Sequence, residues 1–368
     1  MGQVAGIPVA VAMDQGWQVQ MKSTVCIAED RQLCEPALKL LLLSLTRRSP
    51  ARPINLFYPP AGQGFLTWLQ RCPQVSLQTH RLKNGFGWNV KPQALMYLLD
   101  VGYDEVIWVD SDIIVNRNLL PIFARLSNDT FVATEDALGD DRDDSNALRA
   151  RLWGFPVGRI FPFGLNSGVL RVTKSHYGLV QRWWELLQSS AYQDSQRKQW
   201  RQRPAHMLGD QDVLAALLTS EEFSEIPVHI LRRGRDILQF NGVYGYTVAE
   251  RIRNLLTGRP TFIHSFAGKP WSERWSEPSA NLTDYLKRVY LDLSPYTLLA
   301  MQFSPELDCD VEWMKPHYMF TKTLRAVGLG IPELVGFPIA VLMDFVRIAK
   351  RTWKTNRFAG ARMAPPNI

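Results

Sequence analysis

The sequence predicts an α/β protein in which a mostly parallel central sheet is flanked by helices. Short apolar runs rich in β-branched residues alternate with longer helical stretches over residues 23–115. Apolar residues make up 46% of the 368 residues, a proportion that is ordinary for a folded protein and excludes disorder across the chain. A chain of this length also provides enough core for one large domain or two ordinary ones.

The alternation is clearest in the first third of the chain. The sequence STVCIAE at 23–29 is a β-branched apolar run that ends in an acid, as expected of a buried strand. The helix that follows contains Pro36, which suits a first helical turn. Because helices separate the strands, this order predicts a parallel, doubly wound sheet. Strands are expected at 23–29, 54–58, 74–80 and 105–115, the last as one continuous run, and helices at 35–47 and 91–101.

The rest of the chain alternates less regularly. The acidic, polar stretch 139–146 predicts an exposed loop that is either part of a lid or merely solvated. A turn that enters a strand is expected at 163–172, a further strand at 262–268, and helices at 177–190, 209–220, 282–291 and 317–327. We therefore divide the chain into an N-terminal segment (1–22), an α/β domain (23–276), a helical C-terminal extension (277–329) and an amphipathic basic tail (330–368).

The positive charge is concentrated at the C-terminus. The 42 Lys and Arg residues exceed the 35 Asp and Glu residues, so the net charge is +7. Residues 347–368 contain six basic residues and no acid, which leaves +1 for residues 1–346. A nearly neutral body argues against a nucleic-acid-binding protein.

The tail has the pattern of an amphipathic helix. Two interpretations stay open: a helix that lies on an anionic membrane surface through residues 331–357, or a helix packed on the domain with a solvated basic face. On one face fall Leu342, Phe345, Val346, Ala349 and Trp353, and on the other Arg347, Lys350, Arg351 and Lys354.

The N-terminus and the cysteines favour a cytosolic protein, or one attached to the cytosolic face of a membrane. The short apolar stretch at the N-terminus lacks the basic region that precedes a signal sequence core. No apolar run approaches the ~20 residues of a spanning helix. The four cysteines show no CxxC spacing, so free thiols are expected rather than disulfides.

The triplet Asp110-Ser111-Asp112 lies inside the apolar run 105–115. Alternate residues of a strand point to the same side, so two carboxylates at its carboxyl end can converge on one cation. Ligands of open α/β sheets bind beyond those strand ends, and a divalent ion held by two carboxylates can also accept phosphate oxygens. An isolated pair is also typical of a solvated loop, but here VIWV precedes it and IIV follows.

Three further motifs carry polar side chains. The triplet N-S-G at 166–168 is typical of a turn, where glycine lets a ligand approach the backbone. The acids of GDQD at 209–212 suit either a helix cap or hydrogen bonds to sugar hydroxyls. In HSFAGKPW at 264–271, the histidine can ligate a metal and the lysine can neutralise a phosphate. Trp88, Trp271 and Trp275 offer either sugar-binding faces or core packing.

Together and in this order, the four motifs resemble glycosyltransferase family 8, which includes glycogenin-like enzymes and bacterial lipopolysaccharide galactosyl- and glucosyltransferases. The resemblance covers roughly residues 23–272. It implies a GT-A fold, a UDP-sugar donor and a divalent metal, usually Mn²⁺ with Mg²⁺ as the alternative. It also implies transfer of a hexose, glucose or galactose, with retention of configuration, to a glycan or a lipid-linked saccharide.

The resemblance also implies a role for individual residues. Asp110, Asp112 and His264 would be the metal ligands, and Asp210, Gln211 and Asp212 the catalytic residues around the transferred sugar. The donor would be bound by Lys91, Ser111, Asn166, Ser167, Gly168, Gly268 and Lys269. Two positions depart from the family pattern: an extra residue separates His264 from Gly268, and Ala215 stands where asparagine is usual.

Retention can arise by front-face attack or by double displacement through a protein nucleophile. An amide such as Gln211 is a poor nucleophile, so the sequence favours front-face attack, with Gln211 and Asp212 stabilising a cationic sugar. A nucleotidyltransferase is the main rival enzyme, but residues 29–36 lack its glycine-rich loop. A non-catalytic protein that binds nucleotide sugars is the other alternative, which the intact D-x-D and D-Q-D motifs disfavour.

Overall fold

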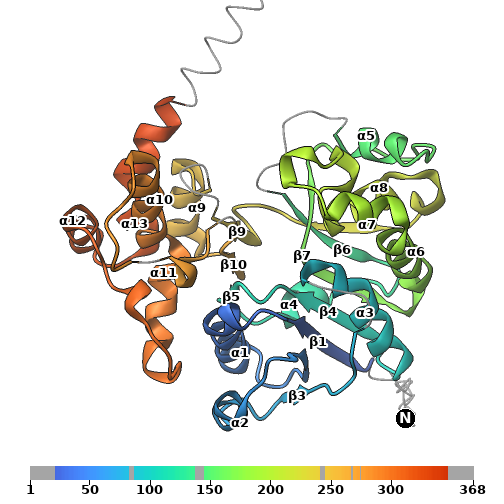
Figure 1. Cartoon of the computed structure of the whole chain (residues 1–368), viewed down its shortest axis with the longest axis horizontal. Coiled ribbons are helices and arrows are strands. Elements are labelled where there is room, and N and C mark those ends of the chain that lie inside the picture. Colours follow the sequence, from blue (N-terminus) through green and yellow to red (C-terminus); the bar gives the residue numbers. More distant parts are fainter. Residues whose placement is uncertain are drawn as a thin grey trace, which may run out of the picture.

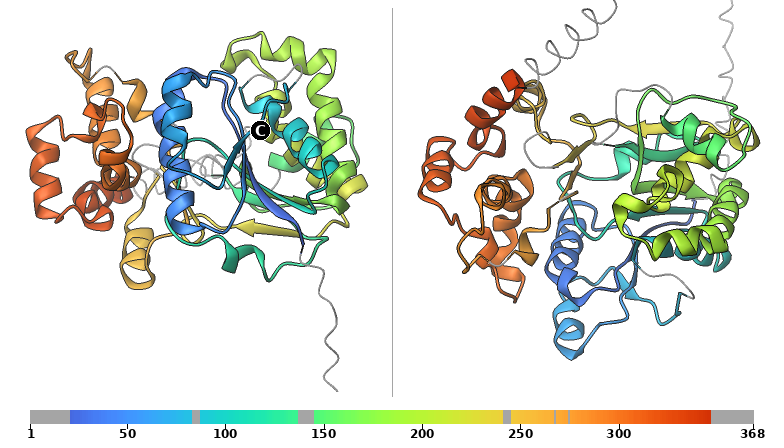
Figure 2. Two further views of the ribbon diagram at one scale, coloured as in Figure 1. Left: turned by 90° about the horizontal axis from the view of Figure 1, so that it is seen from below. Right: turned by 45° about the horizontal axis from the view of Figure 1, so that its top comes forward.

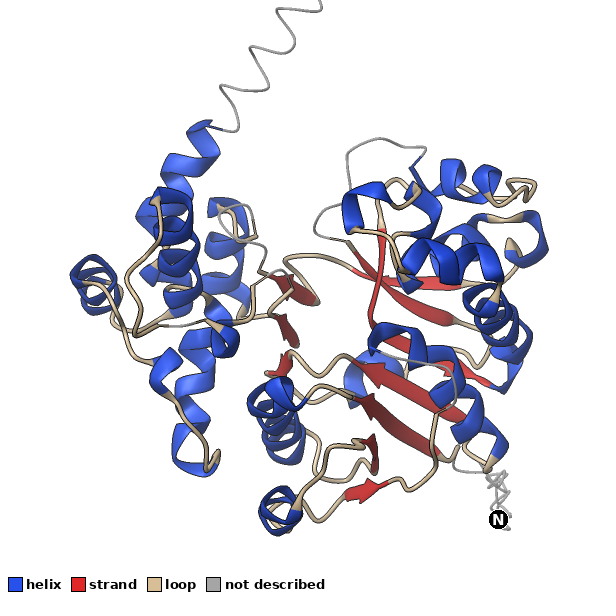
Figure 3. Cartoon of the chain, in the orientation of Figure 1, coloured by secondary structure: helices blue, strands red, loops and turns tan. Residues whose placement is uncertain are grey.

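The structure is a computed structural model, and it describes residues 21–82, 87–136, 145–240, 245–266, 268–273 and 275–346. A large sheet with helices on both faces forms one side of the molecule, and a group of helices forms the other (Figure 1). A small second sheet lies between them (Figure 3). The expected α/β class, with a large central sheet flanked by helices, is confirmed.

The large sheet has seven strands in the order β3-β2-β1-β4-β7-β6-β8. The β3-β2-β1-β4 part is parallel throughout, but β7 runs antiparallel to both β4 and β6. The sheet is therefore mostly parallel, as the sequence predicts, and β7 is the strand that departs from the parallel, doubly wound order. Its strands are β1 Ser23–Ala28, β2 Ile54–Phe57, β3 Val75–Leu77, β4 Glu105–Val109, β6 Phe131–Glu135, β7 Leu165–Thr173 and β8 Val228–Leu231.

Period-two alternation along the central strands separates two hydrophobic cores. Val25 and Ile27 of β1 pack in the core that contains helix α1 (Glu35–Arg48). Cys26 between them packs in the core on the other face, which contains α3 (Lys91–Asp100), α6 (Tyr177–Gln188) and α8 (Asp210–Thr219). Strand β4 repeats this division with Ile107 on the first side and Trp108 on the second. Because both faces are covered, the strands are almost entirely apolar, as expected for a buried sheet.

The helices around the large sheet begin and end close to their expected bounds. Those expected at 35–47, 91–101, 177–190 and 209–220 are all confirmed. Of the expected loop 139–146, residues 139–144 lie outside the described part, and the last two residues begin a helix. The helices of this part are α1 Glu35–Arg48, α2 Gln63–Leu69, α3 Lys91–Asp100, α4 Leu120–Phe123, α5 Ser145–Leu152, α6 Tyr177–Gln188, α7 Ser190–Gln196 and α8 Asp210–Thr219.

The apolar run 105–115 is not one strand, as the sequence predicts, but two strands in different sheets. Strand β4 ends at Val109, and the N–H of Asp110 still donates to the Gly168 carbonyl of β7 at 2.8 Å. The chain then turns, with the Ile113 N–H donating to the Asp110 carbonyl at 3.2 Å, and enters β5 (Ile113–Val115). The break falls at the two carboxylates because a charged side chain is costly to bury in an apolar sheet.

Strand β5 belongs to a second sheet in the order β5-β10-β9, which the sequence did not predict. β10 (Phe262–His264) runs antiparallel to β5, and His264 pairs with Ile113 in the register. β9 (Ile237–Gln239) pairs with β10 in parallel. The small sheet therefore sets the residue that follows the D-x-D turn directly opposite the histidine that ends β10.

The C-terminal helices form a group beside the small sheet. Both views in Figure 2 show this group of helices apart from the large sheet. The helices expected at 282–291 and 317–327 are confirmed. In this group the Asp292 carboxylate, fully buried, accepts hydrogen bonds from Arg325 at 2.6 Å and from the His317 N–H at 3.0 Å. Its helices are α9 Val248–Thr257, α10 Leu282–Asp292, α11 Pro295–Ala300, α12 Met319–Val327 and α13 Pro332–Val335.

The tail is described only as far as residue 346. A further helix covers residues 337–346, and its side chains Leu342 and Phe345 are 62% and 67% exposed. The rest of the expected amphipathic pattern, from Arg347 to Lys354, lies outside the described residues. No helix in the described ranges is both long and apolar enough to cross a membrane.

Candidate functional site

Most of the residues singled out in the sequence meet at one cavity of about 270 Å³. The cavity opens at the carboxyl ends of β1 and β4, where ligands of α/β sheets bind. Its lining includes the following predicted residues: Lys91, Asp110, Ser111, Asp112, Asn166, Asp210, Gln211, His264 and Lys269. The other four predicted residues, Ser167, Gly168, Asp212 and Gly268, lie behind this lining and contact it.

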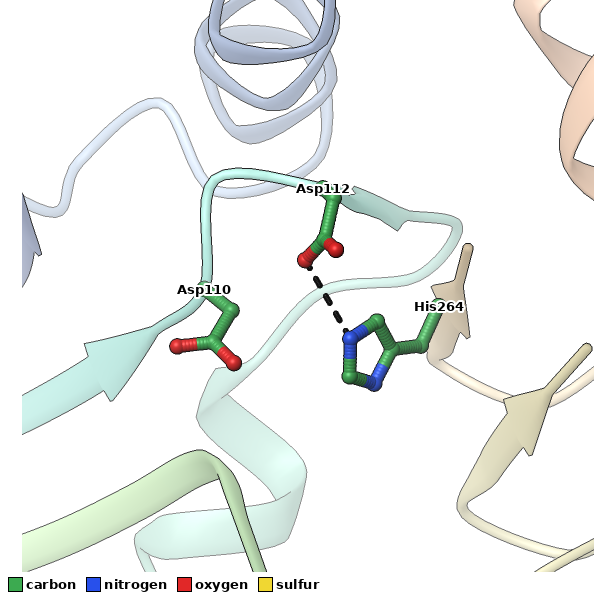
Figure 4. A group of neighbouring side chains, drawn as sticks. All are labelled: Asp110, Asp112 and His264. Atoms are coloured by element: carbon green, nitrogen blue, oxygen red, sulfur yellow. Dashed lines mark ion pairs between the residues drawn. The ribbon is translucent and has the colours of Figure 1, made fainter. Parts of the chain in front are cut away.

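Asp110, Asp112 and His264 form a group suited to a metal ion (Figure 4). Each offers one ligand atom, and the three atoms lie within 4.8 Å of one another. His264 is 2% exposed, and its Nδ1 has no hydrogen-bond partner among the described residues, while its Nε2 lies 3.2 Å from Asp112 Oδ1. Two carboxylates and an imidazole are ligand types that Mn²⁺ and Mg²⁺ sites use, so the residues fit a divalent cation.

The two aspartates of this group are held by different cations. Lys269 Nζ pairs with the Asp112 carboxylate and donates to the Ser265 carbonyl at 2.7 Å. Burial alone would raise the pKa of Asp112, but the charges of Lys269 and His264 outweigh it and hold this pKa well below its usual range. Asp110 pairs with Lys91 at 3.1 Å and also accepts a hydrogen bond from Trp108 Nε1 at 2.7 Å. Both carboxylates are thereby oriented toward the cavity.

Lys91, at the start of α3, connects the metal group with the start of α8. It is 3% exposed, and its Nζ lies 3.1 Å from Asp110 Oδ1 and 3.3 Å from Asp210 Oδ2. It also donates to Ser167 Oγ at 2.7 Å, and Ser167 Oγ donates to Asp210 Oδ2 at 2.8 Å. Burial would lower the pKa of Lys91, but the two carboxylates raise it above its ordinary value. This lysine is therefore a buried cation between two acids.

The N-S-G triplet lies within strand β7 and not in the turn expected from its composition. Asn166 faces the cavity and donates from Nδ2 to Gln211 Oε1 at 2.8 Å, which fixes the orientation of that amide. Its Oδ1 accepts the Gly168 N–H at 2.8 Å. A Cβ at Gly168 would lie 2.8 Å from Asn166 Oδ1 and 3.0 Å from His264 Cε1, so glycine leaves the space that the histidine ring fills.

The variant Gly168→Ala should loosen the metal group without unfolding the protein. The added methyl has to displace His264 by a few tenths of an ångström, and disturbed support of a ligand typically lowers metal affinity about 10–100-fold. The measurement is Mn²⁺ titration followed by electron paramagnetic resonance. The control is Gly178→Ala in α6, where a Cβ meets no atom within 4 Å. Equal Mn²⁺ affinity in the two variants would contradict the placement of His264.

The acids at the start of α8 have two different environments. Asp210 faces the cavity and Lys91, and burial raises its pKa above the ordinary value despite that lysine. Asp212 lies away from the cavity, where it accepts the Gly209 N–H at 2.9 Å and pairs with Arg149 at 2.8 Å. Asp212 is therefore the helix-capping acid, and α5 anchors it through Arg149.

The buried Asp212 should make stability depend on pH. Burial, opposed by Arg149, raises its pKa from 3.8 to about 6 in the folded state. The folded protein thus binds this proton more tightly than the unfolded chain, so the contribution is complete below pH 3.8 and is lost as the pH rises through 6. Chemical denaturation should show that the native protein loses about 2 kcal/mol of unfolding free energy relative to Asp212→Asn between pH 4 and pH 7. A difference that stays constant with pH would contradict this assignment.

The segment after β10 brings its polar groups to the same cavity. The Ser265 N–H donates to the Asp112 carbonyl at 3.0 Å, and Ser265 Oγ donates to the Gly268 carbonyl at 2.6 Å. A Cβ at Gly268 would lie 2.4 Å from Leu291 Cδ2 of α10, so this glycine allows the segment to pack against the C-terminal helices. Trp271 and Trp275 pack against the hydrophobic core, so for these two residues core packing is confirmed.

Several lining residues were not singled out in the sequence. Glu29, the acid that ends the β1 run, accepts Ser111 Oγ at 2.5 Å and forms a two-point ion pair with Arg31. Burial alone would raise the pKa of Glu29, but the bonds to Arg31 and Ser111 outweigh it and lower this pKa below its ordinary value. Trp108 and Trp200 also line the cavity. The acid after an apolar strand was a usable signal for Glu29, whereas no local pattern marks either tryptophan.

The structure is similar to several solved glycosyltransferases at low sequence identity. The bifunctional glycosyltransferase WbbM matches with a TM-score of 0.46 and 16% identity over 68% of this chain, and the match spans 47% of WbbM, about half its length. The galactosyltransferase LgtC, solved with donor and acceptor sugar analogues, matches with a TM-score of 0.46 and 16% identity over 77% of this chain and 99% of LgtC. Mouse xyloside xylosyltransferase 1 matches with a TM-score of 0.41 and 15% identity, over 66% and 97% of the two chains. No protein-family model and no curated protein matches the sequence.

Proposed function

We propose that this protein is a metal-dependent, retaining glycosyltransferase of GT-A fold, which moves a hexose from a UDP-sugar to a glycan or lipid-linked saccharide. One observation carries the proposal. The four motifs that resemble glycosyltransferase family 8 lie far apart in the sequence, yet a residue of each lines the same cavity. Glucose or galactose is the donor sugar that the resemblance favours.

The metal group supports the proposal on chemical grounds. Asp110, Asp112 and His264 would hold a divalent cation, Mn²⁺ or alternatively Mg²⁺, because their ligand atoms already lie within 4.8 Å of one another. When bound, such a cation supplies positive charge to the diphosphate of the donor. Lys269, beside Asp112 at the cavity wall, would add a second cation for the same diphosphate. Ser111 lies between the two aspartates in this lining.

In the proposed transfer, the bond between the anomeric carbon and the β-phosphate oxygen breaks, and its electron pair leaves with UDP. An acceptor hydroxyl oxygen bonds to the same face of that carbon, and its proton passes to the departing phosphate oxygen. Asp210 and the Gln211 amide, oriented by Asn166, would stabilise the cationic sugar. Asp212 would act through the start of α8, because its carboxylate is held by Gly209 and Arg149. Trapping a sugar covalently on Asp212 would contradict this front-face route.

The decisive experiment is an assay of the purified protein with a panel of UDP-sugars and Mn²⁺, with and without saccharide acceptors. The proposal expects release of UDP from one UDP-hexose, and loss of that release when EDTA removes the metal. A nucleotidyltransferase would instead form a nucleotide sugar and pyrophosphate from UTP and a sugar 1-phosphate. A non-catalytic binding protein would bind a UDP-sugar without turnover. Either of these results would overturn the proposal.

The tail supports a second, separate proposal of contact with an anionic membrane surface through residues 331–357. Leu342 and Phe345 stay exposed on the last described helix, immediately before the six basic residues of 347–368. Because Glu333 and Val335 of α13 are buried, deleting the whole tail would disturb packing. We therefore expect Leu342→Ser with Phe345→Ser to weaken sedimentation with anionic vesicles about tenfold or more. Unchanged binding to such vesicles would favour the alternative of a solvated basic face.

A further inference from the structure

We infer that the outer rim of the cavity binds an acceptor saccharide that carries an anionic group, a phosphate or a carboxylate. Trp88 and Trp200 provide the sugar-binding faces, and the basic segment 197–203 provides the charge. The inference rests on the proposed glycosyl transfer and extends it, because it names the chemical class of the acceptor.

Trp88 and Trp200 stand at the cavity rim in an arrangement that core packing does not explain. They line the cavity, yet they are 43% and 53% exposed. Their ring centroids are 6.5 Å apart and their planes are nearly perpendicular, at 82°. Large exposed aromatic faces beside a polar cavity are suited to the apolar faces of sugar rings.

The chain next to Trp88 and the ring of Trp200 each have a polar contact. Asn89, next to Trp88, accepts a hydrogen bond from the buried Tyr192 of α7 at 2.8 Å. The Arg203 guanidinium lies 5.5 Å from the centre of the Trp200 ring and donates to the carbonyls of Gln196 and Leu208. Such contacts reduce the conformational entropy that this part of the rim would lose on binding.

The position of Trp88 indicates that it contacts the acceptor. Its Nε1 lies 3.8 Å from where a Cβ of Gly209 would be, directly before Asp210 and Gln211. Those two residues are the ones proposed to surround the transferred sugar. A saccharide stacked on the rim would therefore lie beside the residues proposed to surround the transferred sugar.

The segment around Trp200, the residue that lines the cavity, is rich in positive charge. Residues 197–203 contain four basic residues and no acid, although residues 1–346 together carry only +1. Arg197 forms an exposed pair with Asp194, and Arg203 is occupied with carbonyls. Lys198 and Arg201 are exposed, and neither has an ion pair with any described residue. Two exposed cations in the same segment as Trp200, unpaired among the described residues, favour a saccharide whose phosphate or carboxylate they can neutralise.

The test compares the binding of three probe sugars to the full chain in the presence of Mn²⁺ and UDP. Glucose 6-phosphate and glucuronic acid carry the two candidate anions, and methyl glucoside is the neutral reference. Titration calorimetry at about 20 mM salt should give the better charged sugar an affinity about tenfold above the neutral one, and about 500 mM salt should remove most of this advantage. Equal affinities for all three sugars at low salt would overturn the inference.

Two variants assign the effect to the rim. The pair Lys198→Ala with Arg201→Ala should abolish the advantage of the charged sugar. Its matched control, Arg253→Ala with Lys322→Ala, removes two exposed bases from α9 and α12 and should keep that advantage. Trp200→Ala should weaken the binding of all three sugars. If the Lys198 and Arg201 variant behaves like its control, the inference fails.

Hydrolysis of the UDP-sugar in water, without an acceptor, separates this inference from the proposed function. The Arg253/Lys322 control variant should hydrolyse the donor as fast as the native protein, and Trp200→Ala should lower transfer to an added charged sugar by a larger factor than it lowers this hydrolysis. If Trp200→Ala slows donor hydrolysis as strongly as it weakens sugar binding, Trp200 serves the donor and the acceptor assignment is wrong. If the native protein consumes no UDP-sugar at all, the proposed function fails, while binding of a charged sugar that depends on Lys198 and Arg201 would still support the anionic subsite.

Discussion

Asp112→Asn should lower kcat/KM for transfer from the UDP-sugar by about 10³-fold or more. In the proposed metal group of Asp110, Asp112 and His264, this change would remove a charged ligand, and such losses cost several kcal/mol of transition-state stabilisation. The asparagine also leaves Lys269 without its anionic partner. Steady-state kinetics with added Mn²⁺, together with Mn²⁺ affinity from electron paramagnetic resonance, measures both effects.

The matched control is Asp104→Asn, which removes a carboxylate just before the amino end of the same strand β4. Asp104 pairs with Lys174 on the exposed surface, far along the strand from the cavity. Such a surface pair contributes roughly 0–1 kcal/mol, so activity should stay close to that of the native protein. Near-normal transfer by Asp112→Asn, with its fold intact in a thermal melt, would refute the metal assignment.

Lys91→Met should destabilise the fold by about 3–5 kcal/mol, measured by chemical denaturation in EDTA. Lys91 is 3% exposed and lies within 3.3 Å of carboxylate oxygens of both Asp110 and Asp210. Removing one partner of a buried ion pair leaves an uncompensated charge, which costs more than the pair itself contributed. Methionine keeps the length of the side chain, so the loss of charge and not of volume dominates the effect.

Two comparisons isolate the charge effect. Adding Asp210→Asn to Lys91→Met removes one of the two carboxylates left without their lysine, so it should recover part of the lost unfolding free energy. If the two residues were independent, the destabilisations by the two single substitutions would add. Lys174→Met removes a lysine whose side chain is 58% exposed, and should change stability by less than about 1 kcal/mol. If Lys91→Met is as stable as Lys174→Met, the loss of the buried cation does not destabilise the fold, and the prediction is wrong.

The local order of strands and helices is readable from the sequence because it depends on short-range periodicity. The β1 run and the helices α1, α3, α6 and α10 lie within a few residues of their expected bounds, since each has one clear apolar pattern. The prediction of one continuous strand at 105–115 is wrong for a related reason, since it too depends on short-range apolar pattern alone. Both halves of this run are apolar, and apolar character does not say which sheet a strand joins.

The candidate site shows the same division. The side chains able to do chemistry are evident in the sequence, because carboxylates, an imidazole and a lysine stand next to apolar runs at 110–112, 210–212 and 264–269. The sequence did not determine their neighbours. Lys91 between two acids, Asp212 capping α8, and Gly168 making room for His264 all depend on contacts between segments distant in the chain.

The tertiary structure alone decided where the cavity and its rim are formed. The pairing of β5 with β10 brings His264 to the D-x-D turn, and the packing of α7 and the segment after it brings Trp200 to Trp88. Such contacts between distant segments are selected by the burial of whole faces of the sheet and helices, a cooperative property of the folded chain that no short stretch of sequence contains.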